Sequence, residues 1–389
     1  MLFTKTLRTA MFVVLSISAL TACQTSHQMN IDAQTVLFDQ GFIGFERVQL
    51  EDQQAIFSLS DDARQFVKNA VSRTTDPEEQ VRNLVESIFG HSKFNLLYDG
   101  NANTTASETF KNRAANCLSM SIMTYALAKE AGMGVDFQDV DIPEFWTRRQ
   151  GYSLLNGHIN LRLTPKVDPY IYKWQTQGFQ VDFDPEASRQ KFSRRVVNIN
   201  TIMAMFYNNK GADALVNNRF TEAYAYFRQA ILTDSLYESS MVNLGFLYRL
   251  KGYFSQAQTS YDYALRINPN SLSAMENLAY LYSLTDRPEQ ARALLSKVER
   301  RRADNPYYFV NLGETELDLG NYHSALQYFK KALSLSRKTH EIYFGLARTY
   351  FKLDDKALTE HYLQLAKNYA NNPRDEGRYQ QKLNFLTSL

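Results

Sequence analysis

The chain has little proline and almost no excess of charge. Its 389 residues include nine prolines, and 43 Lys and Arg nearly balance 41 Asp and Glu, for a formal net charge of +2 at pH 7. A net charge this small argues against a nucleic-acid-binding surface. The sequence has no CxxC, HExxH or glycine-rich phosphate-loop pattern, so we expect no metal, nucleotide or other cofactor. Scarce proline together with 24 tyrosines favours helical repeats.

Cysteine is scarcer still, and the first of the two cysteines ends a segment typical of exported proteins. The segment MLFTKTLRTAMFVVLSISALTAC has two basic residues and then an apolar stretch too short to span a bilayer. Its ending, LTAC, resembles a bacterial lipobox, which implies a signal peptide over 1–23 and a lipid on Cys23. Gln24 then implies the outer membrane, with the chain anchored on its periplasmic face. The alternative is an ordinary signal peptide with a cysteine near its cleavage site.

The second cysteine, Cys117, has no partner once Cys23 carries a lipid. Structural cysteines come in pairs in an oxidising compartment such as the periplasm. A leftover cysteine in an exported protein indicates either intermolecular pairing or a reactive thiol. The alternative is a buried cysteine that packs as a small hydrophobic residue.

Residues 201–373 repeat with a period of 34, and the marker of each repeat is a small residue. This position holds Gly211, Gly245, Ala279, Gly313 and Ala347. Small residues are needed where two antiparallel helices cross closely, and a single helix pair cannot bury its own apolar face. The stretch NLGFLYRLKGYFSQAQTSYDYALRINP resembles the tetratricopeptide repeat consensus. The resemblance implies an all-α solenoid of five repeats over 201–373, with a capping helix over 374–389.

Solenoids of this family expose a concave groove that is lined by the first helix of each repeat. One repeat position holds an asparagine, at Asn209, Asn243, Asn277 and Asn311. In the family this asparagine often hydrogen-bonds the backbone of a bound peptide. Three aromatic residues are expected in the same groove, namely Phe246, Tyr280 and Phe344. The resemblance therefore implies a protein or peptide partner. The alternative is a solvated groove in which the asparagine is only part of the consensus.

Residues 60–200 do not repeat and follow an N-terminal extension over 24–59. Ser60 and Asp76 are expected to cap two helices. From Cys117 to Ala128 nearly every residue is apolar or small, which predicts a helix buried on almost all sides, with Asn116 as its N-cap. A cysteine in the first turn lies at the positive end of the helix dipole, where a thiolate is favoured. The position therefore suits a nucleophile.

Two predicted strands follow and carry the base and the orienting carboxylate that a nucleophilic thiol requires. The stretch GHINLRLTP alternates, which places His158, Asn160 and Arg162 on one face. In GFQVDFDPE, Asp182 and Asp184 share a face, so alternation does not separate them. Asp182 directly ends the apolar core of the strand, whereas Asp184 precedes a proline.

The order of cysteine helix, histidine strand and aspartate strand resembles the transglutaminase-like superfamily, a papain-type cysteine fold. The resemblance rests on NRAANCLSMSIMTYALAKEAG, GHINLRL and VDFDP, roughly residues 105–190. It implies an α+β domain over 60–200 in which Cys117 is the nucleophile, His158 the base, and Asp182 or Asp184 the orienting residue. Ala115 departs from the glycine usual in the family, and this departure affects the backbone beside the nucleophile.

These observations predict an outer-membrane lipoprotein with a transglutaminase-like α+β domain followed by an all-α tetratricopeptide solenoid. The Cys117 thiolate would attack an amide carbonyl of a protein or peptide, and water or an amine would resolve the thioester. Hydrolysis and acyl transfer both stay open, and the repeats would recruit the substrate or partner. The alternative is a non-enzymatic adaptor or scaffold lipoprotein with an inactive transglutaminase-like domain.

Overall fold

The computed structural model describes residues 33–90, 94, 96–166, 178–183 and 192–387. Five α-helices lie between residues 53 and 130 of the described chain. They are α1 (Gln53–Phe57), α2 (Asp61–Val71), α3 (Pro77–Phe89), α4 (Ala106–Asn112) and α5 (Cys117–Glu130). In the part of the chain that the structure describes, no helix is both long and apolar enough to cross a membrane.

The predicted capping residues begin three of these helices. Ser60 accepts a hydrogen bond from the backbone N–H of Ala63, and Asn116 accepts one from Ser119. Asp76 accepts from two backbone N–H groups in the first turn of α3. Each cap satisfies N–H groups that have no partner inside the helix. Helix α5 is buried on nearly all sides, as its apolar composition predicts.

Four strands form an antiparallel sheet on which α5 packs. In sheet order they are β7 (Phe179–Val181), β6 (Ile159–Thr164), β3 (Gly134–Val140) and β8 (Arg194–Val197). The hydroxyl of Ser121, one turn into α5, donates to the carbonyl of Ile159 at the start of β6. Two short parallel strands, β1 (Leu97–Tyr98) and β2 (Ala114–Ala115), lead into α5. This region therefore mixes helices with strands, and its packing brings the N-terminal end of α5 beside the start of β6.

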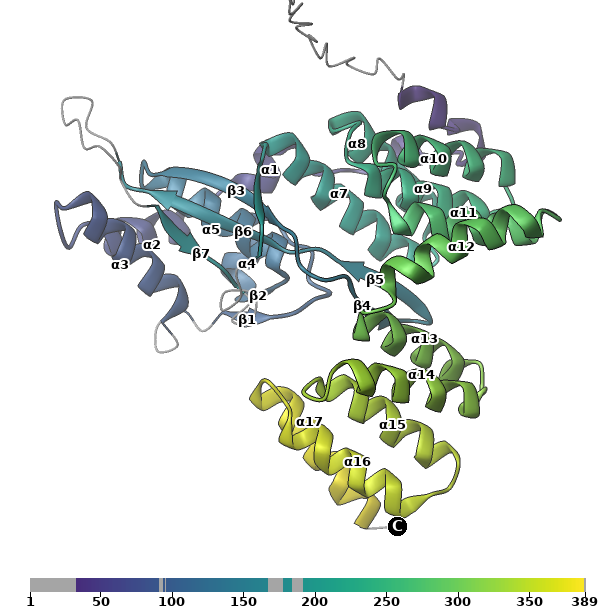
Figure 1. Cartoon of the computed structure of the whole chain (residues 1–389). Helices are drawn as coiled ribbons and strands as arrows, with labels where there is room; N and C mark the ends of the chain where they lie inside the picture. The colour runs from purple at the N-terminus through teal and green to yellow at the C-terminus, as the bar shows by residue number, and fades with distance from the viewer. Residues whose placement is uncertain (1–32, 91–93, 95, 167–177, 184–191, 388–389) are drawn as a thin grey trace, which may run out of the picture. The chain divides into compact units, whose positions relative to one another are not determined.

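A separate β-hairpin is inserted between β3 and β6. Its strands are β4 (Phe145–Arg149) and β5 (Tyr152–Asn156), which pair only with each other in their sheet. Gln150 and Gly151 form the turn with φ of 50° and 83°, the left-handed backbone that a two-residue hairpin turn requires. The hairpin extends away from the four-stranded sheet toward the helices that follow in the chain (Figure 1). The sequence analysis does not predict it.

The remaining residues form consecutive helix pairs and a last helix. The pairs are α7 (Ile199–Val216) with α8 (Phe220–Thr233), α9 (Glu238–Leu250) with α10 (Phe254–Ile267), α11 (Leu272–Leu284) with α12 (Pro288–Arg302), α13 (Pro306–Asp318) with α14 (Tyr322–Leu335), and α15 (His340–Lys352) with α16 (Lys356–Asn368). Helix α17 (Pro373–Thr387) follows the fifth pair and packs on α16.

The small residues of the 34-residue period lie where the two helices of a pair cross. A Cβ atom on Gly245 would come within 2.6 Å of the Tyr261 ring, and one on Gly313 within 2.8 Å of the Phe329 ring. Both distances are below van der Waals contact, so a larger residue would push the helices apart. The prediction of closely crossing helices is confirmed, and the successive helix pairs form an all-α solenoid.

The beginning of the described chain packs on this helical array. Residues 33–47 form three short 3-10 helices. Phe42 stacks on Tyr224 of α8 with ring centroids 4.3 Å apart, and the Tyr224 hydroxyl donates to Asp39. The Tyr248 hydroxyl of α9 donates to the carbonyl of Val36. The described part of the N-terminal extension therefore packs on the first two helix pairs.

Candidate functional site

Cys117 is the first residue of α5, and the residues around it hold the helix start in place. The Asn116 side chain accepts from the backbone N–H of Ser119 at 2.9 Å and donates to Asn103 at 2.5 Å. Cys117 itself is partly exposed, whereas the next seven residues of the helix are buried. The thiol is thus accessible at the end of an otherwise inaccessible helix.

His158 and Asp182 meet beside this helix. His158 precedes β6 and Asp182 follows β7, and the pairing of Leu161 with Val181 brings these two strand ends together. The Nε2 atom of His158 lies 2.8 Å from Oδ1 of Asp182, and the two side chains are only 3% and 4% exposed. Asp184 and Cys23 lie outside the described residues. Of the two candidate aspartates, Asp182 is thus the one whose contact with His158 is described.

Asn160 holds the second oxygen of the same carboxylate, and the sequence analysis gives it no role. Its Nδ2 atom donates to Oδ2 of Asp182 at 2.8 Å, and Asn160 is fully buried. Asn160 lies two residues after His158, so both side chains fall on one face of the strand. That spacing is the signal that could have identified it. The two contacts fix the carboxylate toward the imidazole ring.

The charge of His158 is set by its two neighbours. Burial by itself lowers the pKa of His158, but hydrogen bonds and charge interactions with Asp182 and Cys117 outweigh it. Together they raise the pKa of His158 from 6.5 to about 10. The ring is therefore an imidazolium at neutral pH, hydrogen-bonded to the Asp182 carboxylate and interacting with Cys117. This arrangement can stabilise a thiolate and deliver a proton.

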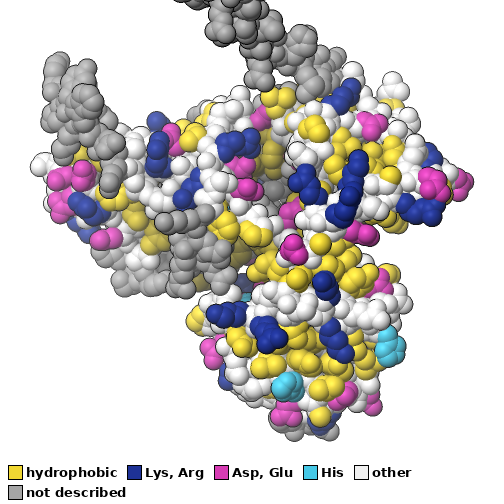
Figure 2. All heavy atoms as spheres, viewed as in Figure 1, with side chains coloured by type: hydrophobic (Ala, Val, Ile, Leu, Met, Phe, Trp, Pro, Cys, Tyr) yellow, Lys and Arg dark blue, Asp and Glu magenta, His cyan; other side chains and the backbone are white. Residues whose placement is uncertain are grey.

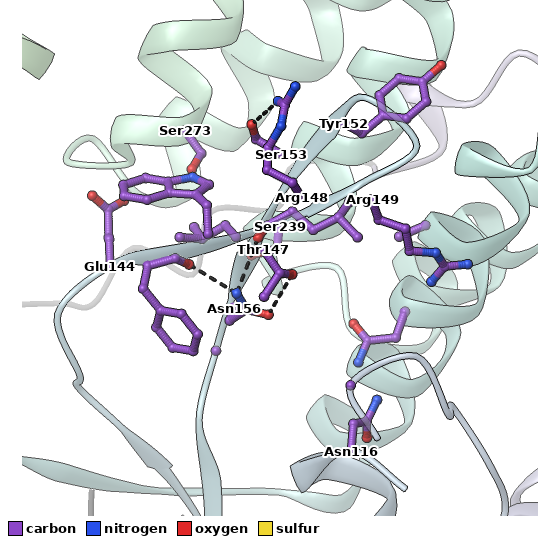
Figure 3. A pocket seen from close by; sticks show the side chains of 18 of the residues that line it. Asn116, Glu144, Thr147, Arg148, Arg149, Tyr152, Ser153, Asn156, Ser239 and Ser273 are labelled. Carbon is purple, nitrogen blue, oxygen red and sulfur yellow. Dashed lines mark hydrogen bonds between the residues drawn. The ribbon is translucent and has the colours of Figure 1, made fainter. Parts of the chain in front are cut away.

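Cys117 and His158 line a cavity of about 3200 Å³. Side chains of the hairpin line this cavity, among them Arg149 and Tyr152, and Asn116 before α5 lies below them in the view of Figure 3. The first helices of the repeats form the opposite wall. The cavity is several times larger than the roughly 300–1,000 Å³ typical of small-molecule sites, so its size suits a polypeptide.

Six of the seven predicted groove residues line this cavity. They are Asn209, Asn243, Asn277, Asn311, Phe246 and Tyr280. The asparagines do not all face solvent freely, because Asn243 donates to Asn208 and Asn277 accepts from Arg249. Whether they bind a peptide stays a prediction.

Phe344 does not line this cavity, and it does not share the repeat position of Phe246 and Tyr280. Continuing their 34-residue step leads to positions 314 and 348, not 344. Phe344 packs against Tyr379 of α17, with ring centroids 5.1 Å apart, and lines a second cavity of about 490 Å³. Figure 2 shows hydrophobic side chains gathered on this face of the C-terminal repeats.

Within the described residues, no group of three or more His, Cys, Asp and Glu side chains is placed to hold a metal ion.

Comparison with known proteins places the repeats in a family. Two tetratricopeptide repeat models match residues 248–309 and 306–339. Protein O-mannosyl-transferase TMTC3 of Mus musculus is 29% identical over 173 residues, which cover 40% of this chain and 19% of that protein. The tetratricopeptide repeat-containing protein trd-1 of Caenorhabditis elegans is 19% identical over 175 residues, covering 44% of this chain and 23% of that protein. The chain spans about a fifth of the length of these relatives.

Solved structures with the same kind of repeat are also similar to this chain. YrrB, described as a TPR protein with an unusual peptide-binding site, is 16% identical with a TM-score of 0.26, over 46% of this chain and 92% of that one. Pseudomonas aeruginosa PilF is 19% identical with a TM-score of 0.30, over 46% and 82%. The matching repeat models and the helix pairs packed at small residues lead to one conclusion: the C-terminal part of this chain is a tetratricopeptide repeat solenoid.

Proposed function

We propose that this chain is a polypeptide-binding scaffold in which the repeats recruit a protein partner. The observation that supports this proposal most directly is the single cavity of about 3200 Å³ lined by asparagines from four successive repeats. Side-chain amides carry both donors and acceptors, so a row of them suits the N–H and C=O groups of an extended backbone. The matched repeat models favour this role over amide chemistry, because they cover the repeats and not the Cys117 region.

Replacing both Asn243 and Asn277 with alanine should weaken partner capture about tenfold or more and leave the thermal melt nearly unchanged. Each replacement removes one or two hydrogen bonds to a bound backbone, at about 0.5–1.5 kcal/mol apiece. Capture is measured by quantifying the proteins crosslinked to the chain in its native cells. The matched control replaces Asn368 and Asn384, which lie on α16 and α17 and do not line this cavity. A collapsed melt would show the two groove asparagines to be structural.

A second function is favoured by the contact between His158 and Asp182 at 2.8 Å and by the interaction of His158 with Cys117, which helps to raise the pKa of the histidine. We infer that Cys117 can perform acyl transfer on an amide, as the resemblance to transglutaminase-like proteins implies. The thiolate would attack the carbonyl carbon, and the Cys117 backbone N–H would help stabilise the developing oxyanion.

The remaining steps use the same three side chains. As the tetrahedral intermediate collapses, the carbon–nitrogen bond breaks, His158 gives its proton to the leaving amine, and a thioester remains on Cys117. Water or a second amine then attacks the thioester, with His158 accepting its proton, so that free thiol and a carboxylic acid or a new amide result. Asp182 keeps the imidazole in orientation throughout. The non-enzymatic adaptor is the alternative, and a thiol with ordinary reactivity would favour it.

Anchoring through Cys23 completes the proposal and is supported by the lipobox-like ending of the first segment. Replacing Cys23 with serine should move the chain from the membrane fraction to the soluble periplasmic fraction, because a lipidated cysteine inserts acyl chains into the bilayer. Fractionation and the mass of the mature N-terminus measure this. Unchanged fractionation without a lipid mass would reject the anchor and leave the other proposals standing.

A further inference from the structure

We propose that the hairpin β4–β5 is a ligand that the chain supplies to its own repeat groove, and that the external partner is an extended segment with the chemistry of this hairpin. The proposal deepens the scaffold function and rests on it. In this proposal the groove has one site that binds a carboxylate, two that bind aromatic rings and two that bind guanidinium groups.

The carboxylate site lies at the residue that begins the hairpin. The Arg302 guanidinium of α12 donates to both carboxylate oxygens of Glu144, at 2.7 and 2.9 Å, and to Glu276 at 2.8 Å. Asn305 donates to the backbone carbonyl of Glu144 at 2.8 Å. Arg302 is only 1% exposed, and a buried guanidinium without its carboxylates is costly. The repeats therefore carry a built site for an acidic side chain.

Aromatic contacts come next along β4. The Trp146 ring lies 4.9 Å from the Arg302 guanidinium and 6.2 Å from the ring of Tyr308. Phe145 faces Tyr307 with ring centroids 6.2 Å apart. Edge and tilted ring pairs of this kind add to the free energy gained by burying the rings. Two adjacent aromatic side chains are thus recognised by α12 and α13.

Polar contacts fix the other end of the hairpin. Arg148 pairs with Asp318 of α13, and Arg149 pairs with Asp213 of α7. Beside the first of these pairs, the Ser153 hydroxyl donates to Asn311, one of the predicted groove asparagines, at 2.6 Å.

The contacts of the hairpin therefore extend from the first repeat to the fourth. Tyr152 adds an edge contact with Phe246 at 5.9 Å, in the second repeat. The groove that the sequence predicts for an external peptide is therefore contacted at several points by the chain itself.

Two features indicate that the hairpin exchanges with a partner and is not a fixed part of the fold. It forms a two-stranded sheet of its own, and such a sheet is only marginally stable without further packing. Its contacts through Arg148 and Arg149 are partly exposed ion pairs, which contribute little to the stability of the docked hairpin. Because the hairpin is tethered beside the groove, its effective concentration is on the order of millimolar. A free segment with the same groups competes against that concentration.

The test measures binding of a fluorescent peptide with the sequence of residues 143–157, PEFWTRRQGYSLLNG, to the full chain by anisotropy. Replacing Arg148 and Arg149 with glutamine in the chain weakens the tethered hairpin and leaves the groove residues unchanged. The peptide should then bind this double variant at least about tenfold more tightly than it binds the wild type. A peptide with both arginines replaced by glutamine should lose that gain.

The matched control is Arg162→Gln, which removes the same charge from an ion pair with Asp136 inside the four-stranded sheet. It should bind the peptide as the wild type does. Equal binding to all three chains, or none to any, would overturn the proposal and make the hairpin a permanent brace. Should the double variant fail to fold, the wild type is tested with the peptide at millimolar concentration. Faster hydrogen exchange over residues 145–156 would then support the proposal, and unchanged exchange would overturn it.

Discussion

Replacing His158 with alanine should slow alkylation of Cys117 by iodoacetamide at pH 7 by about tenfold or more. In the wild type the imidazolium of His158 interacts with Cys117, and an adjacent cation stabilises the reactive thiolate. Mass spectrometry of the peptide that contains Cys117 separates its reaction from that of Cys23. The matched control is His323→Ala, because His323 is an exposed histidine on α14. Should the wild type react at the rate of free cysteine, Cys117 is not activated and the adaptor function is the better account.

The same residues should decide any turnover of an amide substrate. Cys117→Ala and His158→Ala are each expected to reduce turnover by about a thousandfold or more, and the double replacement should add little because the pair acts as a unit. Asp182→Asn should lower the rate by a few orders of magnitude without abolishing it, since the carboxylate orients the ring and does not react. An equal loss in Asp184→Asn would contradict the assignment of the orienting role to Asp182.

His158 should also make the stability of the chain depend on pH. Burial lowers the pKa of His158, but its hydrogen bonds and charge interactions with Asp182 and Cys117 raise it to about 10, against 6.5 for the free side chain. A raised folded-state pKa gives stabilisation that is complete below pH 6.5 and is lost as the pH rises to 10. For a side chain that is 3% exposed, we expect a loss on the order of 4 kcal/mol in the free energy of unfolding.

Urea unfolding at steps from pH 6 to pH 10 measures this loss. The quantity of interest is the difference between the wild type and His158→Gln, because groups that do not interact with His158 titrate equally in both chains. The difference should shrink steadily between pH 6.5 and 10. Parallel curves over that interval would mean that Asp182 and Cys117 do not hold His158 in its charged form.

The repeats could be predicted from the sequence because their contacts are local. Gly245 and Tyr261 are sixteen residues apart, and the packing between them recurs every 34 residues, so the period reveals it. The contact between His158 and Asp182 could also be anticipated, since the sequence predicts two successive strands, one with His158 and the next with Asp182. Alternation could not choose between Asp182 and Asp184, because both fall on one face.

The hairpin could not be predicted for a different physical reason. Its strands are short, and their side chains are satisfied by residues far along the chain, such as Arg302 and Asp318. Neither periodicity nor local capping carries information about such partners. Asn160 lay within reach of sequence reasoning, since it shares a strand face with His158. Its role can be assigned only once this strand face is known to be buried.

The hairpin also sets an order of assembly. Glu144 and Arg302 are 158 residues apart in sequence, and Arg148 and Asp318 are 170 apart. Closing loops of this length is entropically costly and slow, whereas neighbouring repeats fold through contacts between adjacent helices. The strands of the four-stranded sheet end with β8, but the core that they share with α5 also includes Ile202 of α7 and Ala230 of α8. We therefore expect the thiol site to fold once the first repeat is complete, and the hairpin to dock in the groove only after the fourth repeat has formed.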